Sequence, residues 1–314
     1  MKLRKLGRTD LHIPEVGLGA MFIGAAAPDS PGQMDEDRAC ETVVAAIEAG
    51  STFVDTAPVY GGGLSERAIG RVLRERPDLA EKATIVTKVG ARPGERNYSY
   101  DGVMRHVGAS QERLGIETFD LLSIHDAMGE PMEDVLAKDG ALGALRKLQD
   151  EGIVKYVGSA MNDLPTNEPY IETGEFDVAV VPNGLSVLNR SIEERVFPAA
   201  EKHGVGLLIA QPYERGLLAV GPDAGISFHR RNFSEECLAH VRDVQALCGR
   251  YELPLSAVSL RYILRHPLVS AVIPGARTPK EATENANASE IEIPEALWDE
   301  LLPTLKHWEL GVHR

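Results

Sequence analysis

The chain has 314 residues, 43% of them hydrophobic and 25% charged, which is typical of an ordinary globular protein and excludes a disordered or fibrous one. Its 47 acidic side chains outnumber 33 basic ones, and the resulting net charge of −14 argues against nucleic acid or an anionic membrane as the main partner. The three cysteines, an odd number with no C-x-x-C pair, fit neither a disulfide framework nor a structural zinc site, so a reducing cytoplasm is the expected compartment.

The first segment, residues 3–13, predicts a short β-hairpin, because the polar stretch from Gly7 to Asp10 separates two alternating runs. The beginning of the chain contains no uninterrupted apolar stretch of the kind found in a signal peptide. No later run approaches the roughly 18 apolar residues that a membrane helix needs. We therefore expect a chain that is neither exported nor membrane-spanning.

Eight short apolar runs recur along the chain, separated by longer amphipathic stretches. Each run is rich in Val, Ile or Leu, a pattern typical of strands that are buried on both faces of a parallel sheet. The runs are Val16–Gly19, Thr52–Asp55, Ala83–Lys88, Leu121–His125, Val154–Ser159, Val178–Val181, Val205–Ala210 and Val269–Ile273.

The stretches between these runs show helical spacing. A helix is predicted over residues 35–49, with an apolar face that recurs every four residues and with Gly50 as its stop. A second helix is predicted to begin at Ser65, a good N-cap residue, and a third carries Val103 and Val107 on its apolar face.

Eight repeats of strand followed by helix predict a (β/α)8 barrel, whose usual range of about 200 to 400 residues includes this length. A single domain over residues 1–314 is expected, because no low-complexity segment or Pro/Gly/Ser-rich linker divides the chain. The N-terminal hairpin would cap one barrel mouth. Residues 234–250 also show helical spacing and precede another predicted helix over 255–264, which gives one helix more than the barrel needs.

Polar residues close three of the predicted strands, namely Asp55, Lys88 and His125. In such a barrel the chemistry takes place at the carboxyl ends of the strands, so these side chains are expected around one mouth. Tyr60 follows Asp55 in a loop that leads to three consecutive glycines. Taken singly, each residue has an ordinary explanation as a helix cap, a solvated lysine, a structural histidine or a packed tyrosine. Together they form a reactive set that packing does not require.

This set suggests proton transfer at a carbonyl or hydroxyl group. A neighbouring ammonium such as Lys88 stabilises the phenolate of Tyr60 and lowers its pKa. Asp55 would hold Lys88 by an ion pair, and His125 would hydrogen-bond the substrate oxygen. The chain has no G-x-S-x-G, H-E-x-x-H or Walker-type motif, so acyl transfer, zinc hydrolysis and phosphoryl transfer are not supported. Proton transfer without a nucleophile suits hydride chemistry, in which a cofactor supplies the hydride.

The stretches that hold these residues resemble the aldo-keto reductase superfamily, and the resemblance covers essentially the whole chain. They are Phe53 to Glu66, Val86 to Gly90 and Asp120 to Asp126. The resemblance implies a (β/α)8 barrel that binds a nicotinamide dinucleotide without a Rossmann fold. It also implies that Tyr60 is the general acid/base, that Lys88 and Asp55 tune it, and that His125 orients the substrate.

In the family the cofactor phosphates lie near the last two strands, and the matching segments here are residues 211–218 and 273–285. The second segment ends a strand and opens a helix, so its backbone N–H groups and helix dipole suit an anion. The start of a solvated helix explains Arg277 and Lys280 equally well. The resemblance implies that Glu284 and Asn285 hold the adenine. The full set of implied cofactor contacts is Asn162, Gln211, Tyr213, Arg215, Gly216, Leu217, Gly275, Arg277, Lys280, Glu284 and Asn285.

The chain departs from the family pattern around the nicotinamide. Relatives often carry a Gln and a Tyr on strand six, but residues 181–185 contain neither, and Asn183 stands there instead. The usual Ser-Asn pair after strand five is replaced by residues 158–162, in which Asn162 is expected to bind the carboxamide.

The preference between NADP and NAD depends on opposing charges. Glu281 stands where many NADP-preferring relatives have Arg, and its charge would repel a 2′-phosphate. Arg277 and Lys280 argue the other way. On balance the sequence favours NADP, with NAD as the alternative.

The chain looks most like the bacterial branch that includes aldose 1-dehydrogenases acting on fucose, galactose or related sugars, on the basis of residues 55–61, the His125–Asp126 pair and residues 158–162. The resemblance therefore implies an NAD(P)-dependent oxidoreductase of carbohydrate metabolism that interconverts an aldehyde or sugar hemiacetal with an alcohol or lactone. Trp298 and Trp308 are candidates for lining the pocket, although packing of helices explains them more simply.

Two other functions stay open. One is a general reductase of small aldehydes and ketones. The other is a cofactor-binding, redox-sensing module without significant turnover, of the kind that serves some membrane channels. A small carbonyl compound or sugar is the expected partner, no metal site is predicted, and homo-oligomerisation is left open.

Overall fold

The computed structural model describes residues 1–27, 33–225, 231–308 and 311–312. Within these residues, eight parallel strands form one sheet in the order β13-β11-β10-β9-β8-β5-β4-β3. Parallel bridges from Val16 to Val272 and from Gly19 to Gly275 join its two edges, so the sheet closes into a barrel. The strands are β3 (Leu18–Gly19), β4 (Phe53–Asp55), β5 (Thr84–Val89), β8 (Phe119–His125), β9 (Val154–Ala160), β10 (Val178–Pro182), β11 (Gly206–Ala210) and β13 (Val269–Ile273). Each strand overlaps one of the eight predicted runs, and the predicted (β/α)8 barrel is confirmed.

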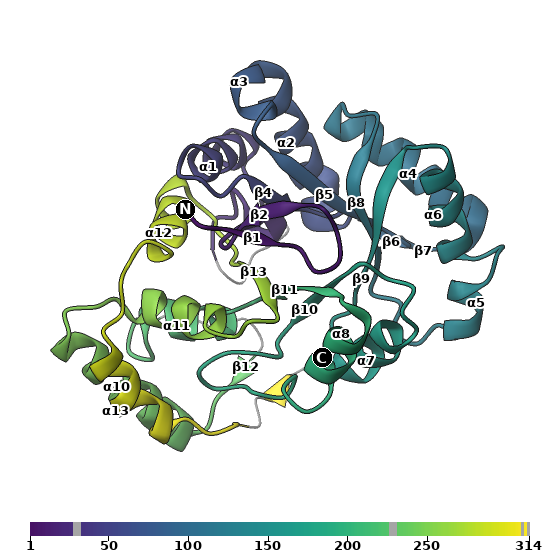
Figure 1. Ribbon diagram of the computed structural model, residues 1–314. Helices are drawn as coiled ribbons and strands as arrows, with labels where there is room; N and C mark the ends of the chain where they lie inside the picture. The colour runs from purple at the N-terminus through teal and green to yellow at the C-terminus, as the bar shows by residue number, and fades with distance from the viewer. Residues whose placement is uncertain (28–32, 226–230, 309–310, 313–314) are drawn as a thin grey trace.

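Helices surround the barrel and connect successive strands (Figure 1). The helix predicted over residues 35–49 is confirmed as α1, which spans Glu36–Glu48 between its caps. It starts there because the carboxylate of Asp35 accepts the backbone N–H of Arg38 at 2.8 Å. The surrounding helices are α1 (Glu36–Glu48), α2 (Leu64–Glu75), α4 (Tyr100–Leu114), α6 (Ala141–Asp150), α7 (Leu164–Glu172), α8 (Val196–His203), α11 (Leu255–Leu264) and α12 (Pro279–Ala288).

The predicted start of α2 was wrong. The helix begins at Leu64, after Gly63 in the left-handed conformation at φ +88°, so Ser65 lies inside it. The Ser65 hydroxyl is fully buried and donates to the carbonyl of Ala20 at 3.0 Å, with the Thr56 hydroxyl 2.8 Å away. Ser65 therefore ties the helix to the loops at the carboxyl ends of β3 and β4.

The predicted N-terminal hairpin is confirmed as β1 (Leu3–Lys5) paired antiparallel with β2 (His12–Pro14). It lies across the centre of the ring of helices in Figure 1, over the amino ends of the barrel strands. Its turn approaches β11 so closely that a Cβ on Gly7, which has φ +53°, would lie 2.1 Å from the backbone nitrogen of Gly206. Glycine at position 7 thus allows the hairpin to seat on the barrel.

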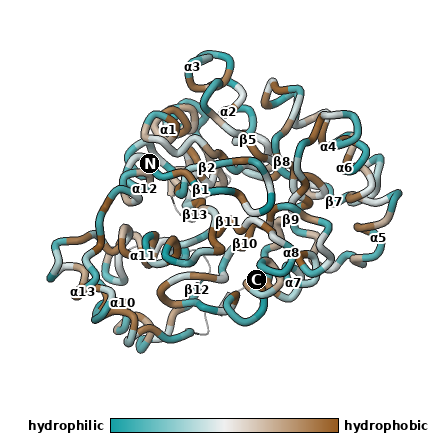
Figure 2. The backbone as a smooth tube through the Cα atoms, in the orientation of Figure 1, coloured by the Kyte–Doolittle hydropathy of each residue, from teal (hydrophilic) through white to brown (hydrophobic). Residues whose placement is uncertain are grey.

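Apolar side chains fill the inside of the barrel beneath the hairpin. Figure 2 shows hydrophobic segments concentrated on the central strands and hydrophilic ones on the outer turns. The inner cluster contains Leu6, Ile13, Phe53, Val86, Leu121, Ala160, Val178, Val180, Leu208, Ala271 and Ile273. Because this end is closed by packing, the space for a ligand lies at the opposite mouth, at the carboxyl ends of the strands.

The remaining elements are additions to the barrel. The predicted extra helix is confirmed as α10 (Glu235–Arg250), capped by the side chain of Ser234, and it packs against α11 and α13. Trp298 and Trp308 pack against the core and do not line the main cleft. The other additions are α3 (Pro77–Ala80), α5 (Met132–Leu136), α9 (Leu217–Val220), α13 (Glu295–Leu301), the β6–β7 hairpin (Ala91–Arg92 and Glu95–Arg96) and the β12–β14 pair (Arg231–Asn232 and Gly311–Val312).

A helix that crosses a membrane needs about 20 predominantly apolar residues. In the parts of the chain that the structure describes, no helix combines enough length with enough apolar character to cross a bilayer.

Candidate active site

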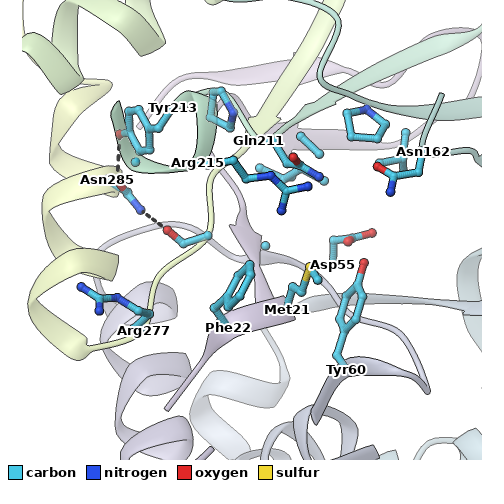
Figure 3. Close-up of a pocket in the computed structure, with 18 of the residues that line it drawn as sticks. Met21, Phe22, Asp55, Tyr60, Asn162, Gln211, Tyr213, Arg215, Arg277 and Asn285 are labelled. Atoms are coloured by element: carbon cyan, nitrogen blue, oxygen red, sulfur yellow. Dashed lines mark hydrogen bonds between the residues drawn. The ribbon is translucent and has the colours of Figure 1, made fainter. Parts of the chain in front are cut away.

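A cleft of about 640 Å³ opens at the carboxyl ends of the barrel strands (Figure 3). Asp55 ends β4, Lys88 lies near the end of β5, and His125 ends β8, so three strands bring these side chains to one mouth. Tyr60 joins them from the loop that follows β4, and all four line the cleft. The four residues predicted to act together are therefore assembled in one place.

Lys88 is the centre of this group. Its ammonium nitrogen donates to Asp55 Oδ1 at 2.7 Å, to the carbonyl oxygen of Thr56 at 2.7 Å and to the phenolic oxygen of Tyr60 at 3.3 Å. The side chains of Lys88 and Asp55 are almost completely buried. With three acceptors around it, the ammonium is held in one position, and that position is against the tyrosine hydroxyl.

The backbone after β4 aims the tyrosine. Tyr60 begins a short 3-10 turn, η2 (Tyr60–Gly63), in which Gly61 and Gly62 have φ of +55° and +65°. A Cβ on Gly61 would lie 2.0 Å from the sulfur of Met34, so a larger residue would have to displace that side chain as well as adopt a strained φ. The glycines predicted to form a turn thus carry the chain sharply from the cleft into α2.

Burial and charge shift the acid–base properties of this group in opposite directions. Burial raises the pKa of Tyr60 to about 12, while the Lys88 ammonium acts to lower it and the Asp55 carboxylate to raise it. Burial acts to lower the pKa of Lys88, but Asp55 and Tyr60 raise it on balance. Tyr60 is therefore a protonated hydroxyl beside a permanent cation at neutral pH, which suits the release of its proton to a developing alkoxide.

His125 faces Tyr60 across the mouth. The two rings meet edge to face with centroids 6.0 Å apart. Burial and the positive charges of Lys88 and Arg96 place the pKa of His125 well below its usual range, so the imidazole is neutral. Its Nδ1 is buried, and no hydrogen-bond partner for it occurs among the residues that the structure describes. A neutral imidazole can hydrogen-bond a substrate oxygen without adding a charge.

Most of the predicted cofactor residues line the other part of the same cleft. They include Asn162, Gln211, Tyr213, Arg215, Gly216, Gly275, Arg277, Glu284 and Asn285. Figure 3 shows the labelled side chains of Asn162, Gln211 and Arg215 on one side of the cleft and Asp55 and Tyr60 on the other. Two predicted residues lie elsewhere: Leu217 is completely buried in the core, and the Lys280 side chain is 83% exposed on the outside of α12.

The segment that follows β11 has an unusual backbone. Gln211, Glu214 and Arg215 have φ of +57°, +48° and +61°, a conformation that costs energy in residues other than glycine. Gln211 Oε1 is buried, and within the described residues nothing donates to it. Strained residues and an unsatisfied polar atom in a cleft are both expected where a ligand binds.

Tyr213 and Asn285 connect this segment to α12. The Tyr213 hydroxyl donates to Asn285 Oδ1 at 2.8 Å, and Asn285 Nδ2 donates to the carbonyl of Gly275 at 3.1 Å (Figure 3). The start of α12 is capped by Thr278, whose hydroxyl accepts the backbone N–H of Glu281 at 3.2 Å. This network fixes one wall of the cleft.

Glu281 neutralises one of the predicted phosphate-binding cations. Its carboxylate accepts the backbone N–H of Arg277 at 2.7 Å and the guanidinium of Arg277 at 2.5 Å. Lys280 pairs with Glu284 at 3.7 Å in an exposed position. The two cations expected to meet a phosphate are thus already beside carboxylates.

Sequence reasoning missed a polar network that runs from Asn162 at the cleft to the buried residues Arg231 and Glu214. Asn183 Nδ2 donates to Asn162 Oδ1 at 3.3 Å, and Arg231 donates to Asn183 Oδ1 at 2.6 Å. Arg231 also pairs with the buried carboxylate of Glu214. No sequence motif indicates this network, because Arg231 lies in β12 and Glu214 in the segment that follows β11.

Met21, Phe22 and Asp126 also line the cleft and were not predicted to do so. Met21 and Phe22 lie in a 3-10 turn, η1 (Ala20–Phe22), after β3. The sequence did contain a clue for Asp126, since it directly follows His125 at the end of a barrel strand.

The chain is similar in sequence and in fold to known proteins. The family model described as "Aldo/keto reductase family" matches residues 15–302. The chain is 31% identical to pyridoxal 4-dehydrogenase of Microbacterium luteolum, over 95% of this chain and 96% of that protein. It is 29% identical to D-threo-aldose 1-dehydrogenase of a Pseudomonas species, over 93% and 94% of the two chains. Among solved structures, the holo form of the aldo-keto reductase AKR11C1 from Bacillus halodurans superposes with a TM-score of 0.80 and 25% identity, over 100% of this chain and 98% of that chain.

Proposed function

The chain belongs to the aldo/keto reductase family, and from this premise we propose that it is a nicotinamide-dependent oxidoreductase acting on an aldehyde or sugar hemiacetal. The reaction interconverts that group with an alcohol or a lactone by hydride transfer. The observation that carries the proposal is the contact between the Lys88 ammonium and the Tyr60 hydroxyl at the mouth of the barrel. We also propose that residues 1–314 act as one domain, since the hairpin and α10 both pack against barrel elements.

The residues of the cleft fit a nicotinamide dinucleotide. Gln211 Oε1 is buried without a partner within the described chain, and the amide of Asn162 is exposed to the cleft, so the two can hold a carboxamide. Arg215 extends into the cleft beside them and would meet a phosphate, as would the backbone around Gly216 and Gly275 (Figure 3). Asn285 and Glu284 would hold the adenine. When bound, such a cofactor supplies or accepts the hydride.

In the reducing direction, Tyr60 donates its proton to the substrate oxygen as negative charge develops there. Lys88 stabilises the phenolate that remains, because its ammonium lies 3.3 Å from the phenolic oxygen. Asp55 keeps Lys88 charged and fixed in place. The neutral ring of His125 hydrogen-bonds the same substrate oxygen and orients the carbonyl. In the oxidising direction the phenolate of Tyr60 accepts the proton.

The charges around α12 support NAD as the preferred cofactor, the reverse of the balance drawn from the sequence. Arg277 is engaged by Glu281, and Lys280 lies outside the cleft beside Glu284. A 2′-phosphate would add about two negative charges next to the Glu281 carboxylate. Neither Arg277 nor Lys280 would compensate for them, because each is already paired with a carboxylate. An adenosine ribose with a free 2′-hydroxyl can instead donate to Glu281.

The substrate class rests on the two named relatives, of which one is named for an aldose and the other for pyridoxal, a hydroxylated aldehyde. Both names describe dehydrogenases of compounds that carry hydroxyl groups, and this favours a polar, hydroxyl-bearing substrate for this chain as well. A general reductase of small carbonyl compounds is the second candidate. The two candidates differ in whether hydroxyl groups on the substrate raise kcat/KM.

Steady-state turnover with a panel of aldoses and short aldehydes tests the proposal. Both NADH and NADPH, and their oxidised forms, are supplied so that each direction is measured. We expect turnover with at least one hydroxylated aldehyde or aldose. A protein that binds NADH tightly but turns over no member of the panel would instead be a redox-sensing module, and the enzymatic proposal would be abandoned.

A further inference from the structure

Asp126 is the residue that follows His125, and its backbone is fixed in a conformation that is rare for aspartate. It has φ +50°, in the left-handed region. Its N–H donates to the carbonyl of Ala160 at 2.9 Å. Its carbonyl accepts the Tyr98 hydroxyl at 2.8 Å and the Arg96 guanidinium at 2.6 Å. Two segments of the chain, residues 96–98 and Ala160 at the end of β9, thus hold this one residue in place.

The consequence of this backbone is the position of the carboxylate. The Asp126 side chain lines the cleft and is about one third exposed, and its Oδ2 lies 3.6 Å from His125 Nε2. In the part of the chain that the structure describes, no lysine or arginine forms an ion pair with this carboxylate, and Arg96 bonds only to backbone oxygens there. The carboxylate therefore has acceptor capacity available in the cleft, next to the ring that orients the reacting oxygen.

The spacing of His125 and Asp126 defines what they can bind together. Asp126 Oδ2 and His125 Nε2 are 3.6 Å apart, which is little more than the length of one hydrogen bond, about 2.8 Å. Oxygen atoms on neighbouring carbons of one small molecule can each reach one of them. The imidazole would take the oxygen of the reacting carbon, and the carboxylate would accept a hydrogen bond from a hydroxyl on the next carbon.

We propose that Asp126 is a specificity-determining residue that selects substrates carrying a hydroxyl group adjacent to the reacting carbon and rejects anionic ones. The inference rests on the proposed function and narrows its substrate class to α-hydroxy aldehydes and the hemiacetals of aldoses. The rejection follows from the same carboxylate, since its charge repels a second carboxylate in a cleft of low dielectric. Burial raises the pKa of Asp126, and the positive charges of Lys88 and Arg96 and a hydrogen bond from the Asn162 backbone act against that rise.

Two substitutions separate recognition from backbone support. Asp126→Gly removes the carboxylate at a position where φ +50° suits glycine, and Asp126→Asn keeps the shape while removing the charge. The matched control is Asp120→Asn, an exposed aspartate near the opposite end of the same strand, β8. Thermal unfolding of each purified variant shows whether it is folded.

The readout is kcat/KM for three probes: glyceraldehyde, propanal and the anion glyoxylate. For Asp126→Gly we expect kcat/KM for glyceraldehyde to fall by about 10- to 100-fold, mainly through KM, since a charge-assisted hydrogen bond is lost. Activity with propanal and the Kd for NADH should stay within about twofold. Asp126→Asn should lose less activity with glyceraldehyde and gain activity with glyoxylate, and Asp120→Asn should change nothing.

The outcomes that overturn the inference are distinct from those that overturn the proposed function. If Asp126→Gly loses activity equally with glyceraldehyde and propanal, or binds NADH more weakly, Asp126 supports the loop or Asn162 and does not read the substrate. If both variants keep full activity with glyceraldehyde, the carboxylate makes no contact that matters. If the unmodified protein turns over none of the three probes, the proposed function is removed, and the inference with it.

Discussion

The ammonium nitrogen of Lys88 lies 3.3 Å from the phenolic oxygen of Tyr60 and donates a hydrogen bond to it. The same nitrogen is held by Asp55 at 2.7 Å on its other side. Burial raises the pKa of Tyr60 to about 12, so the lysine moderates an upward shift and does not bring the pKa down to neutrality. This balance leaves Tyr60 as a proton donor at physiological pH and determines the first two predictions.

Replacing Tyr60 with phenylalanine removes the hydroxyl and leaves the ring. We expect kcat to fall by about 10² to 10⁴-fold, the usual contribution of a positioned general acid. The Kd for NADH should be nearly unchanged, because only the transferable proton is lost. Single-turnover reduction and fluorescence titration measure the two quantities separately. An equal loss of binding and of rate would contradict this role for Tyr60.

The pH dependence should differ between the two directions of the reaction. Tyr60, with a pKa of about 12, stays protonated well below that pH. The titration of Tyr60 should therefore leave kcat for aldehyde reduction unchanged from about pH 6 to pH 10. Oxidation needs the phenolate, whose fraction rises with pH, so kcat for oxidation should increase about tenfold per pH unit over the same range. The check is a pair of pH–rate profiles with the chemical step shown to limit the rate. A plateau in oxidation near neutral pH would mean that the pKa of Tyr60 is lower in the working complex.

Glu281 should control the preference between the two nicotinamide dinucleotides. Glu281→Gln keeps an oxygen to accept the Arg277 backbone N–H but removes the negative charge beside the Arg277 guanidinium. We expect NADPH binding to tighten by about tenfold, equivalent to about 1.4 kcal/mol, with a change for NADH of less than about twofold.

Fluorescence titrations of both nucleotides at low and at physiological salt measure this effect. The control is Glu295→Gln, an exposed carboxylate on α13 away from the cleft. A wild-type protein that already binds NADPH more tightly than NADH would count against the preference for NAD proposed above.

The N-terminal hairpin should contribute to stability without taking part in catalysis. Leu6 is completely buried and packs with barrel residues at the end opposite to the cleft. Leu6→Ala leaves a cavity there, and we expect the free energy of unfolding to fall by about 2–5 kcal/mol. Chemical denaturation measures that change, and kcat/KM of the folded variant should match that of the unmodified protein. A loss of kcat/KM in the folded variant would show that the two barrel mouths are coupled.

The barrel was predictable from the sequence because its elements are local patterns. Strands buried on both faces need continuous apolar runs, and eight such runs alternate with amphipathic helices. The four cleft residues were predictable for a related reason. Asp55, Lys88 and His125 close successive strands, and parallel strands in a closed barrel bring their carboxyl ends to one mouth.

The contacts between loops were decided by tertiary structure alone. The start of α2 was misplaced because Ser65 is a good cap by type, whereas Gly63 at φ +88° provides the turn and the Ser65 hydroxyl bonds to a neighbouring loop. The pairing of Arg277 with Glu281 is different, because the two residues are four apart at the start of α12 and the contact is local. The contacts of Arg231 with Glu214 and Asn183 also depend on the tertiary structure.

What the sequence by itself determined about this protein is therefore the barrel and the identity of the groups at its mouth. Tertiary structure decided which of those groups are neutralised, which keep unused hydrogen-bonding capacity, and which way their pKa values shift. The physical reason is that periodicity depends on neighbours along the chain. Electrostatics in a cleft depends on burial and on partners from other strands and loops, and these come together only once the barrel has closed.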